Sequence, residues 1–245
     1  MPIPSKSRRI TDCDSCEYRS LRMFCNLSPV ALAEFDALGF EAAFPKGTIL
    51  FQEDEPSNNV LVLCTGQVKL SCGSRDGKTL ILKIALPGDV LGLSAVLTGS
   101  RYEVTAETVE LTQIKKIRRP DFLAFIQKQG EASLHAAQAL SEEYKSAFFD
   151  ARRLALSGSA AGRLASVLLD WGRTASCGKP EMRFTMALTH EELASLSGSS
   201  RETVTRTLTK FQKDKLIRID GSSIVILSSI CQGPRPGPSF NRLLA

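Results

Sequence analysis

Three cysteines stand close together near the N-terminus, with the spacing Cys13-x2-Cys16-x8-Cys25. Thiolates bind soft metal ions, and a thiolate of lowered pKa is also redox-reactive. The chain has seven cysteines, an odd number, and no apolar segment follows its basic N-terminal residues. Neither an export signal nor a disulfide framework is therefore expected. Metal binding, redox chemistry and plain burial of the thiols are the alternatives.

A second group of residues that could do chemistry lies at 201–218, where cations gather. Arginine can hydrogen-bond guanine O6 and N7 in the DNA major groove, and a carboxylate can accept from cytosine N4. Hydroxyls and lysine suit phosphates. This segment holds six cations and two anions, a net charge of +4, whereas the whole chain carries +5. A solvated helix face would use the same residue types, and a helix cap would also explain Glu202.

Two short helices are expected to position this basic segment. Thr189 and Glu192 have the spacing of a capping box, in which the two side chains bond backbone N–H groups at a helix start. Ser197-Gly198 ends that helix after about two turns. Ser199 and Glu202 repeat the capping-box spacing. Two helices about three residues apart, with a glycine between them, are the layout of a helix-turn-helix.

The second helix should have one apolar and one polar face. At about 3.6 residues per turn, Val204, Leu208 and Phe211 share a narrow face that suits burial. The wide opposite face holds Arg201, Glu202, Thr205, Arg206, Thr209 and Lys213, with Thr203, Thr207 and Lys210 on its flank. Asp220-Gly221 then predicts a hairpin at 217–226, which would form a wing beside the helices.

The segment 40–118 predicts a different architecture. Short β-rich runs alternate with glycine turns and no helical pattern separates them, which is typical of a sandwich or jelly roll. Asp76-Gly77 predicts a hairpin between two of the runs. Upstream, Ser28 and Pro29 suit the N-cap and first position of a short helix. The β-rich runs are 48–51, 59–64, 67–72, 79–86 and 104–117.

Residues 131–156 contain neither glycine nor proline and predict one helix, about 40 Å long at about 1.5 Å per residue. A stripe of apolar residues at spacings of three and four fits either a helix lying on the roll or a coiled-coil-like seam between subunits. We expect the seam, because the helix is longer than a small domain needs. Ser157-Gly158-Ser159 then marks a domain boundary, and 164–171 predicts another amphipathic helix. The stripe consists of Ala136, Leu140, Tyr144, Ala147, Ala151 and Leu154.

The order of these parts resembles the Crp/Fnr family of transcription regulators. The likeness rests on Ser200-Arg201-Glu202-Thr203-Val204-x-Arg206 with its wing, and upstream on Lys46-Gly47, Gly66-x-Val68-Lys69-Leu70 and Pro87-Gly88-Asp89-Val90-Leu91-Gly92. It implies an α+β fold with an N-terminal double-stranded β-roll of the cyclic-nucleotide-binding, jelly-roll type, a long dimerisation helix and a C-terminal winged helix-turn-helix. The expected divisions are a cysteine arm at 1–25, the roll at 26–130, the dimerisation helix at 131–157, the DNA-binding domain at 158–228 and a flexible tail at 229–245.

The resemblance also implies roles for individual side chains. Arg201 and Arg206 would bind guanines and Glu202 a cytosine on the opposite strand. A dimer would then read a palindromic site with TGTGA-like half-sites. RNA polymerase is the implied protein partner. Further DNA contacts are expected from Thr189, Ser199, Ser200, Thr203, Thr205 and Lys210.

Several sensed signals are compatible with the sequence. Leu93 and the run Arg101-Tyr102-Glu103 replace residues with which nucleotide-binding relatives hold ribose and phosphate, so cAMP is not expected. Cys13, Cys16 and Cys25 resemble cluster ligands of Fnr-type regulators, which implies an iron–sulfur cluster. A fourth cysteine near the end of the roll is missing, and Cys64, Cys72 or a ligand other than cysteine would have to replace it. Zinc, redox-reactive thiols and no ligand at all are the alternatives.

Other classes of protein are disfavoured by what the sequence lacks. It has two histidines and no nucleophile–base, phosphate-loop or metal-hydrolase pattern, so an enzyme is not expected. No run of about 18 apolar residues is present, so no membrane span is expected and the protein should be cytoplasmic. A ligand-binding regulatory module without DNA binding would also contain the roll, but it would not need the basic helix.

Overall fold

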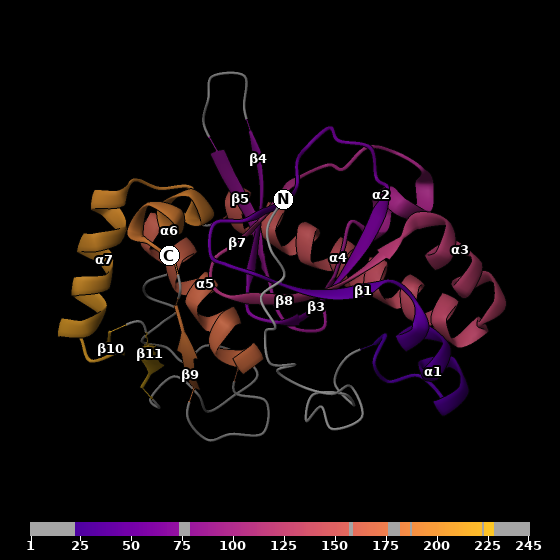
Figure 1. The fold of residues 1–245 in the computed structure, drawn as a ribbon. Helices are drawn as coiled ribbons and strands as arrows, with labels where there is room; N and C mark the ends of the chain where they lie inside the picture. Colours follow the sequence, from indigo (N-terminus) through magenta and orange to yellow (C-terminus); the bar gives the residue numbers. More distant parts are fainter. Residues whose placement is uncertain are drawn as a thin grey trace. The chain divides into compact units, whose positions relative to one another are not determined.

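A computed structural model of the protein describes residues 23–73, 79–156, 159–175, 182–186, 188–221 and 223–227, with the backbone alone for 149–156, 173–175 and 185. The chain forms two compact units, Met1–Gly73 with Leu82–Lys145 and Ser74–Ile81 with Ser146–Ala245 (Figure 1). The boundary between the units falls inside the long helix α4 (Gly130–Leu156). Most of the predicted cysteine arm, the whole predicted tail and the Asp76-Gly77 turn lie outside the described residues.

The first unit contains two four-stranded sheets that form a β-roll. One sheet has the strand order β1-β8-β3-β6 and the other β2-β7-β4-β5. Residues from both sheets, among them Phe51, Leu63 and Ala106, share one buried core, which confirms the predicted jelly-roll class. The strands are β1 (Phe40–Phe44), β2 (Ile49–Phe51), β3 (Asn59–Thr65), β4 (Val68–Gly73), β5 (Thr79–Ala85), β6 (Val90–Leu91), β7 (Thr105–Thr108) and β8 (Thr112–Arg118).

The sequence pattern locates most of these strands but not all of them. The run 104–117 forms two strands, β7 and β8, because residues 109–111 turn the chain between them. The pattern does not predict β1, whose sequence FEAAF lacks β-branched residues. Pairing with β8 holds β1 in place, from Phe40↔Lys116 to Phe44↔Thr112. Strand β6 and the helices α2 (Leu93–Thr98) and α3 (Arg119–Lys128) are also additions to the expected elements.

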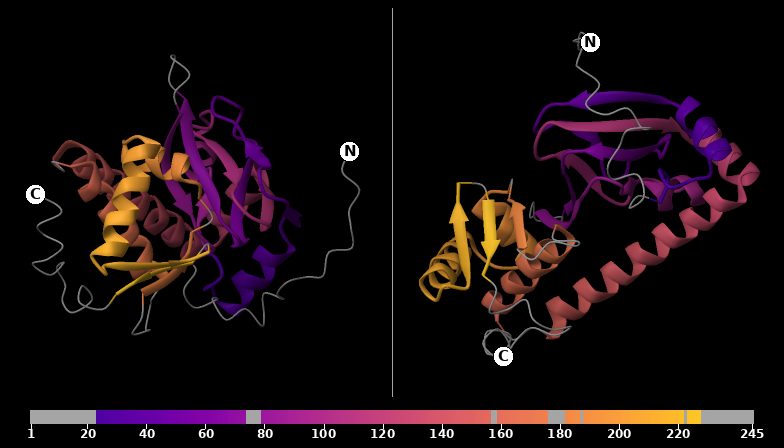
Figure 2. Two further views of the ribbon diagram at one scale, coloured as in Figure 1. Left: turned by 90° about the vertical axis from the view of Figure 1, so that its left-hand side faces the viewer. Right: turned by 90° about the horizontal axis from the view of Figure 1, so that it is seen from below.

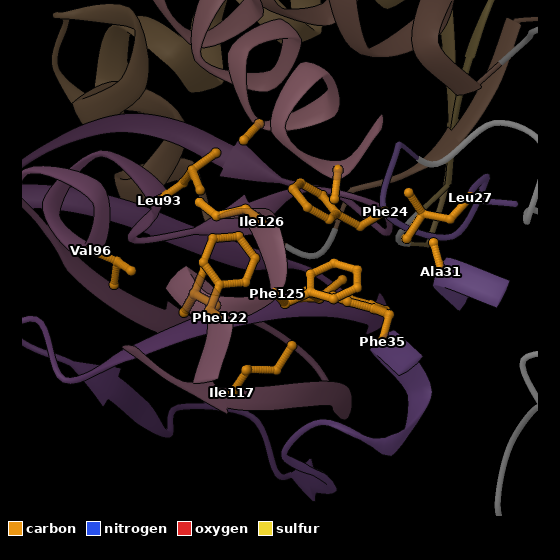
Figure 3. Packing of buried hydrophobic residues seen from close by; sticks show 14 of the residues in the cluster. Phe24, Leu27, Ala31, Phe35, Leu93, Val96, Ile117, Phe122, Phe125 and Ile126 are labelled. Carbon is orange, nitrogen blue, oxygen red and sulfur yellow. The ribbon is translucent and has the colours of Figure 1, made fainter. Parts of the chain in front are cut away.

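An aromatic cluster packs on the outer face of the sheet that contains β3. Successive residues of a strand point to opposite faces, and Val60 and Val62 contribute to this cluster whereas Leu61 and Leu63 point into the roll. Four rings meet in the cluster (Figure 3), and three pairs of their centroids are 5.4, 5.6 and 5.8 Å apart. They come from the segment before α1 (Pro29–Ala37), from α1 and from α3, and they are Phe24, Phe35, Phe122 and Phe125.

The long helix α4 begins against this cluster. Ala132 and Ala136 are buried in it, and Ala139 and Leu140 are partly buried against it. The backbone N–H of Ser28, which precedes Pro29 at the predicted start of α1, donates to Glu131 Oε1 (2.6 Å). The right-hand view of Figure 2 shows α4 as one uninterrupted helix.

The predicted stripe on α4 therefore divides into two parts. Ala136 is 4% exposed and Leu140 packs beside it, so these two residues belong to the core of their own roll rather than to a subunit seam. Tyr144 and Ala147 are exposed, while the side chains of Ala151 and Leu154 lie outside the described residues. A different set of exposed positions alternates by three and four, which is the spacing of a coiled-coil seam. This set is Leu134, Ala137, Ser141, Tyr144 and Phe148.

The second unit combines helices with a small sheet of strand order β10-β11-β9. Strands β10 (Ile217–Asp220) and β11 (Ser223–Ile226) form the predicted wing, and β9 (Met182–Thr185), which the pattern does not predict, extends it. The orange and yellow arrows in the right-hand view of Figure 2 are these three strands. The helices are α5 (Ala160–Ala175), α6 (His190–Ser197) and α7 (Arg201–Lys213). None of the described helices is long and apolar enough to cross a membrane.

We expect Phe24→Ala to lower the free energy of unfolding by about 3–5 kcal/mol, because loss of a ring leaves a cavity in the aromatic cluster. Phe24 is 1% exposed and contacts both Phe35 and Phe122. Urea unfolding of the full chain, followed by circular dichroism, measures the change. Val30→Ala, at a side chain 76% exposed, is the control and should change the free energy by less than about 0.5 kcal/mol. Equal effects would contradict the role given to the cluster.

Candidate nucleic-acid interface and sensor roll

Helix α6 begins at the predicted capping box. Thr189 Oγ1 accepts from the backbone N–H of Glu192 (3.2 Å), and Glu192 Oε2 accepts from the backbone N–H of Thr189 (2.8 Å). The helix ends at Gly198, whose φ of 57° lies in the left-handed region that favours glycine. Leu193 and Leu196 are buried beneath the helix. The first helix of the motif is thus held at both ends and along its inner face.

An arginine from α5, which the motif search does not identify, clamps the turn between α6 and α7. Arg163 donates from Nε to the carbonyl of Ser197 (2.7 Å) and from Nη2 to the carbonyl of Gly198 (2.9 Å). Carbonyls at a helix C-terminus lack partners within the helix and carry partial negative charge, so a guanidinium suits them. In the sequence, Arg163 is only a cation on the preceding helix, a signal too weak to single it out.

Helix α7 begins one residue later than the capping-box spacing predicts. Ser200 is the N-cap, since its Oγ accepts from the backbone N–H of Thr203 (3.3 Å). The hydroxyl of Ser199 is instead hydrogen-bonded to that of Ser197 (2.7 Å) inside the turn. Glu202 therefore stands at the second helical position rather than the third, and the predicted second capping box is wrong.

The carboxylate of Glu202 is held at the start of α7. Hydrogen bonds from its own backbone N–H and from the Ser200 hydroxyl lower the pKa of Glu202, and the charge of Arg201 lowers it further. The carboxylate also faces the positive end of the helix dipole. Glu202 is thus an ionised acceptor whose lone pairs are partly used within the protein.

The two faces of α7 divide largely as predicted. Val204, Leu208 and Phe211 are at most 2% exposed, and Thr207, expected on the flank, is buried beside them. The predicted polar face is exposed. Neither Arg201 nor Arg206 forms an ion pair with any residue that the structure describes, so both guanidinium groups are available to an external acceptor.

The hydroxyl groups on this face already have hydrogen-bond acceptors. Thr205 Oγ1 donates to the carbonyl of Arg201 (3.0 Å), and Thr209 Oγ1 donates to the carbonyl of Thr205 (2.9 Å). Since a hydroxyl has one proton, the 2.9 Å contact between Thr205 Oγ1 and His190 Nδ1 requires the imidazole to donate. This leaves Nε2 of a neutral His190 as an acceptor, and it ties the start of α6 to α7.

Inside the roll, Tyr102 fills the space beside the turn at Gly92. Its ring stacks on Phe51 with centroids 4.0 Å apart, and its hydroxyl donates to the carbonyl of Asn59 (2.5 Å). Gly92 has a φ of 74°, and a Cβ at this position would lie 2.6 Å from Tyr102 Cε1. Burial raises the pKa of Tyr102, so the phenol stays neutral.

Residues around Tyr102 disfavour an anionic ligand. Nη1 of Arg101 donates to the carbonyl of Asp54. The carboxylate of Glu103 accepts from a hydroxyl at the start of α2 (3.3 Å). Partial desolvation raises the pKa of Glu143 on α4, and the negative charges of Glu103 and Asp89 raise it further. A phosphate placed among these carboxylates would be repelled.

Of the three N-terminal cysteines, only Cys25 lies within the described residues. No group of three His, Cys, Asp or Glu side chains in the described ranges is arranged to hold a metal ion. One donor nearby is unsatisfied, since Nδ1 of His135 is buried and makes no hydrogen bond there. The ring of His135 lies edge-on to Phe24, 6.4 Å between centroids, and Cys25 directly follows Phe24. An orphaned imidazole nitrogen beside a cysteine segment fits a metal held by thiolates.

Comparisons with known proteins agree with this architecture. Two family models match, a cyclic nucleotide-binding domain at residues 41–129 and a Crp-like helix-turn-helix domain at 162–229. The chain is 30% identical over 213 residues to the transcriptional activatory protein AadR of Rhodopseudomonas palustris, covering 86% of this chain and 87% of AadR. It is 27% identical over 208 residues to the CRP-like cAMP-activated global transcriptional regulator of Mycobacterium tuberculosis, covering 84% and 92%.

A solved structure shows the same fold. FixK2 from Bradyrhizobium japonicum superimposes with a TM-score of 0.70 at 22% sequence identity, covering 85% of this chain and 98% of FixK2. At this level of identity the likeness concerns the fold alone. It confirms the expected combination of a roll, a long helix and a C-terminal helix-turn-helix.

We expect Arg163→Met to lower the free energy of unfolding of the second unit by about 1.5–3 kcal/mol, because two carbonyls lose a charged donor. The one tryptophan of the chain, Trp171, lies on α5 against Phe184 (6.0 Å between centroids), so its fluorescence reports on this unit during urea unfolding. Lys46→Met removes an exposed cation from the roll and should leave the transition unchanged. An unchanged transition in Arg163→Met would show that the clamp is not needed.

Tyr102 should make the stability of the first unit fall at alkaline pH. A raised pKa in the folded state means that the stabilisation is complete below the unfolded pKa of about 10 and is lost as pH rises through the folded pKa. Tyr102→Phe should remove this dependence and cost about 1 kcal/mol at neutral pH through its lost hydrogen bond. Urea midpoints across the alkaline range measure both effects. Identical pH slopes for the two proteins would contradict the assignment.

Proposed function

Because the chain belongs to the Crp/Fnr family of DNA-binding transcription regulators, we propose that it acts as a homodimer that reads a palindromic site with TGTGA-like half-sites through α7. The observation that carries the proposal is the pair Arg201 and Arg206, both exposed on the polar face of α7 and both without an ion-pair partner in the described part of the chain. Its family consists of regulators rather than enzymes, as the sequence predicts. We place its action in the cytoplasm, where its DNA target lies.

Each arginine is assigned to one guanine, donating to O6 and N7 in the major groove. The two residues are five positions apart, so their Cα atoms differ by about 7.5 Å along the helix axis. Two base steps of about 3.4 Å cover nearly the same distance. This separation supports guanines at alternate positions, as in TGTGA. The two-fold axis of a dimer then requires an inverted second half-site about one helical turn away.

Glu202 is assigned to cytosine N4 on the opposite strand, where it would accept a hydrogen bond. To do so the carboxylate must give up part of its bonding to Ser200 at the start of α7. The phosphate contacts are assigned to Thr189, Ser199, Ser200, Thr203, Thr205 and Lys210. Phosphates accept but do not donate, so a hydroxyl such as that of Thr205 must exchange its internal acceptor for the DNA. The exposed ammonium of Lys210 needs no such exchange.

Homodimerisation is assigned to the exposed face of α4. Leu134, Tyr144 and Phe148 are 58%, 71% and 59% exposed, and large apolar side chains in such numbers favour burial against a partner. With Ala137 and Ser141 they follow the heptad spacing of a coiled coil. A parallel pair of α4 helices would give the two-fold symmetry that a palindromic site needs.

The sensed signal is assigned to Cys13, Cys16 and Cys25, as ligands of an iron–sulfur cluster. Such a cluster, when bound, would supply a response to oxygen or redox state. Their spacing and the unsatisfied nitrogen of His135 beside Cys25 support this assignment. Zinc on the same thiolates and oxidation of metal-free thiols are the competing outcomes. Cyclic AMP is disfavoured by Tyr102 and the carboxylates around it, and RNA polymerase is the partner that the family implies.

We expect Arg206→Ala to cost about 1–3 kcal/mol of binding free energy and to relax the preference at one base position. Lys210→Ala should weaken binding to every duplex and reduce the slope of log affinity against log salt by about one. Fluorescence anisotropy with a symmetric TGTGA-type duplex and a scrambled duplex, at several salt concentrations, measures both. Equal affinity of the unchanged protein for the two duplexes at physiological salt would overturn the proposed site.

The double change Tyr144→Glu with Phe148→Glu should shift the protein to monomers, because like charges would face each other across the seam. Affinity for the palindromic duplex should fall, whereas the weaker binding to a single half-site should not. Sedimentation velocity and anisotropy measure the two effects. Val30→Glu, on the exposed side of α1, is the control and should remain dimeric. A dimer of undiminished stability in the double variant would exclude this face of α4.

A further inference from the structure

We propose that His135 is the fourth ligand of the metal centre, binding through Nδ1 beside the thiolates of Cys13, Cys16 and Cys25. This inference rests on the proposed function only through the metal-binding role of the cysteines. DNA binding by α7 does not depend on it. The proposal therefore stands or falls on metal binding, which can be measured without DNA.

The first observation is the unsatisfied nitrogen itself. Nδ1 of His135 is buried without a hydrogen bond among the described residues. A buried polar atom without a partner is costly, so proteins rarely keep one without a use. In a neutral imidazole, one ring nitrogen carries a lone pair, and that lone pair is what metal ions bind. The neighbouring Phe24 ring, edge-on at 80°, offers no hydrogen-bond partner.

The second observation is where the cysteine segment joins the fold. Phe24 is 1% exposed and is fixed between Phe35 and Phe122, with the ring of His135 against it. Cys25 is the next residue, and consecutive Cα atoms are about 3.8 Å apart. The core therefore anchors one ligand of the predicted set in the neighbourhood of His135. Cys16 is nine residues earlier, and an extended chain of that length can span about 30 Å, so the tether leaves room for the other two.

The donor set also makes chemical sense. Three cysteines and one histidine form one of the usual tetrahedral sets for zinc. Histidine also replaces cysteine on iron in some iron–sulfur clusters. The carboxylate of Glu131, on the same turn of α4, is already used by the backbone N–H of Ser28 (2.6 Å), so it is a weaker candidate.

A ligand at this position would connect the metal to the dimer face. His135 directly follows Leu134, which is the first residue of the exposed seam on α4. Binding or loss of the metal would change how the cysteine segment holds the start of this helix. The proposed centre would thus act on the assembly state through α4 rather than on the DNA-binding surface directly.

The test uses the full chain, purified without oxygen and stripped of metal, with Co²⁺ as the probe. Cobalt bound by thiolates gives charge-transfer bands, and its visible bands depend on the fourth ligand. We expect one Co²⁺ per chain, and we expect His135→Gln to change the visible bands and weaken binding by about tenfold or more, as loss of even an outer-shell partner does. His135→Cys should restore tight binding with a four-thiolate spectrum. His190→Gln, at the second histidine, is the matched control and should bind like the unchanged protein.

Parallel loading with iron and sulfide, or with zinc, shows which metal the site prefers. An unchanged spectrum and affinity in His135→Gln would overturn the proposal, and a loss confined to Cys64→Ser would assign the fourth ligand to Cys64. If the unchanged protein binds none of these metals but still binds the TGTGA-type duplex, the metal centre is refuted while the proposed DNA-binding function stands. Circular dichroism confirms that each variant is folded, and His135→Cys keeps the test decisive if His135→Gln is not.

Discussion

The aromatic cluster around Phe24 is the contact on which the arrangement of the first unit depends. It joins the segment before α1, α1 itself, α3 and the outer face of one sheet to the start of α4. Because Ala132 and Ala136 are buried in it, the rotation of α4 about its own axis is set there. Two residues along a helix are about 200° apart, so burying Ala136 turns Leu134 outward. The exposed seam of α4 is thus a consequence of packing inside a single subunit.

The sequence predicts those features whose cause is local. The capping box of Thr189 and Glu192 and the buried face of Val204, Leu208 and Phe211 follow from spacing alone. The start of α7 was displaced by one residue because two adjacent serines can both serve as caps. The stripe on α4 was assigned to the wrong register because the helix has two apolar faces, and only the folded roll shows which one it covers. Arg163 and Tyr102 act across space, so no local pattern identifies them.

The DNA-binding surface is organised before any DNA arrives. Thr205 links Arg201 to His190, and Glu202 closes the start of α7. These bonds keep the helix ends satisfied in the free protein, so a hydroxyl or carboxylate gains little by moving to the DNA. Arg201 and Arg206 have no such internal partner among the described residues and gain the full contact. Affinity and base discrimination are therefore concentrated in two side chains, with the hydroxyls adjusting the fit.

The close approach of Gly92 to Tyr102 restricts how this sensor could change during evolution. A side chain at position 92 would meet the Tyr102 ring, and it would also require a backbone φ of 74° that glycine alone adopts readily. Shrinking Tyr102 removes the first obstacle but not the second, so position 92 stays glycine either way. A descendant that regained a ligand cavity in the roll would begin at position 102. That route starts with a single substitution, and position 92 would show strong epistasis with it.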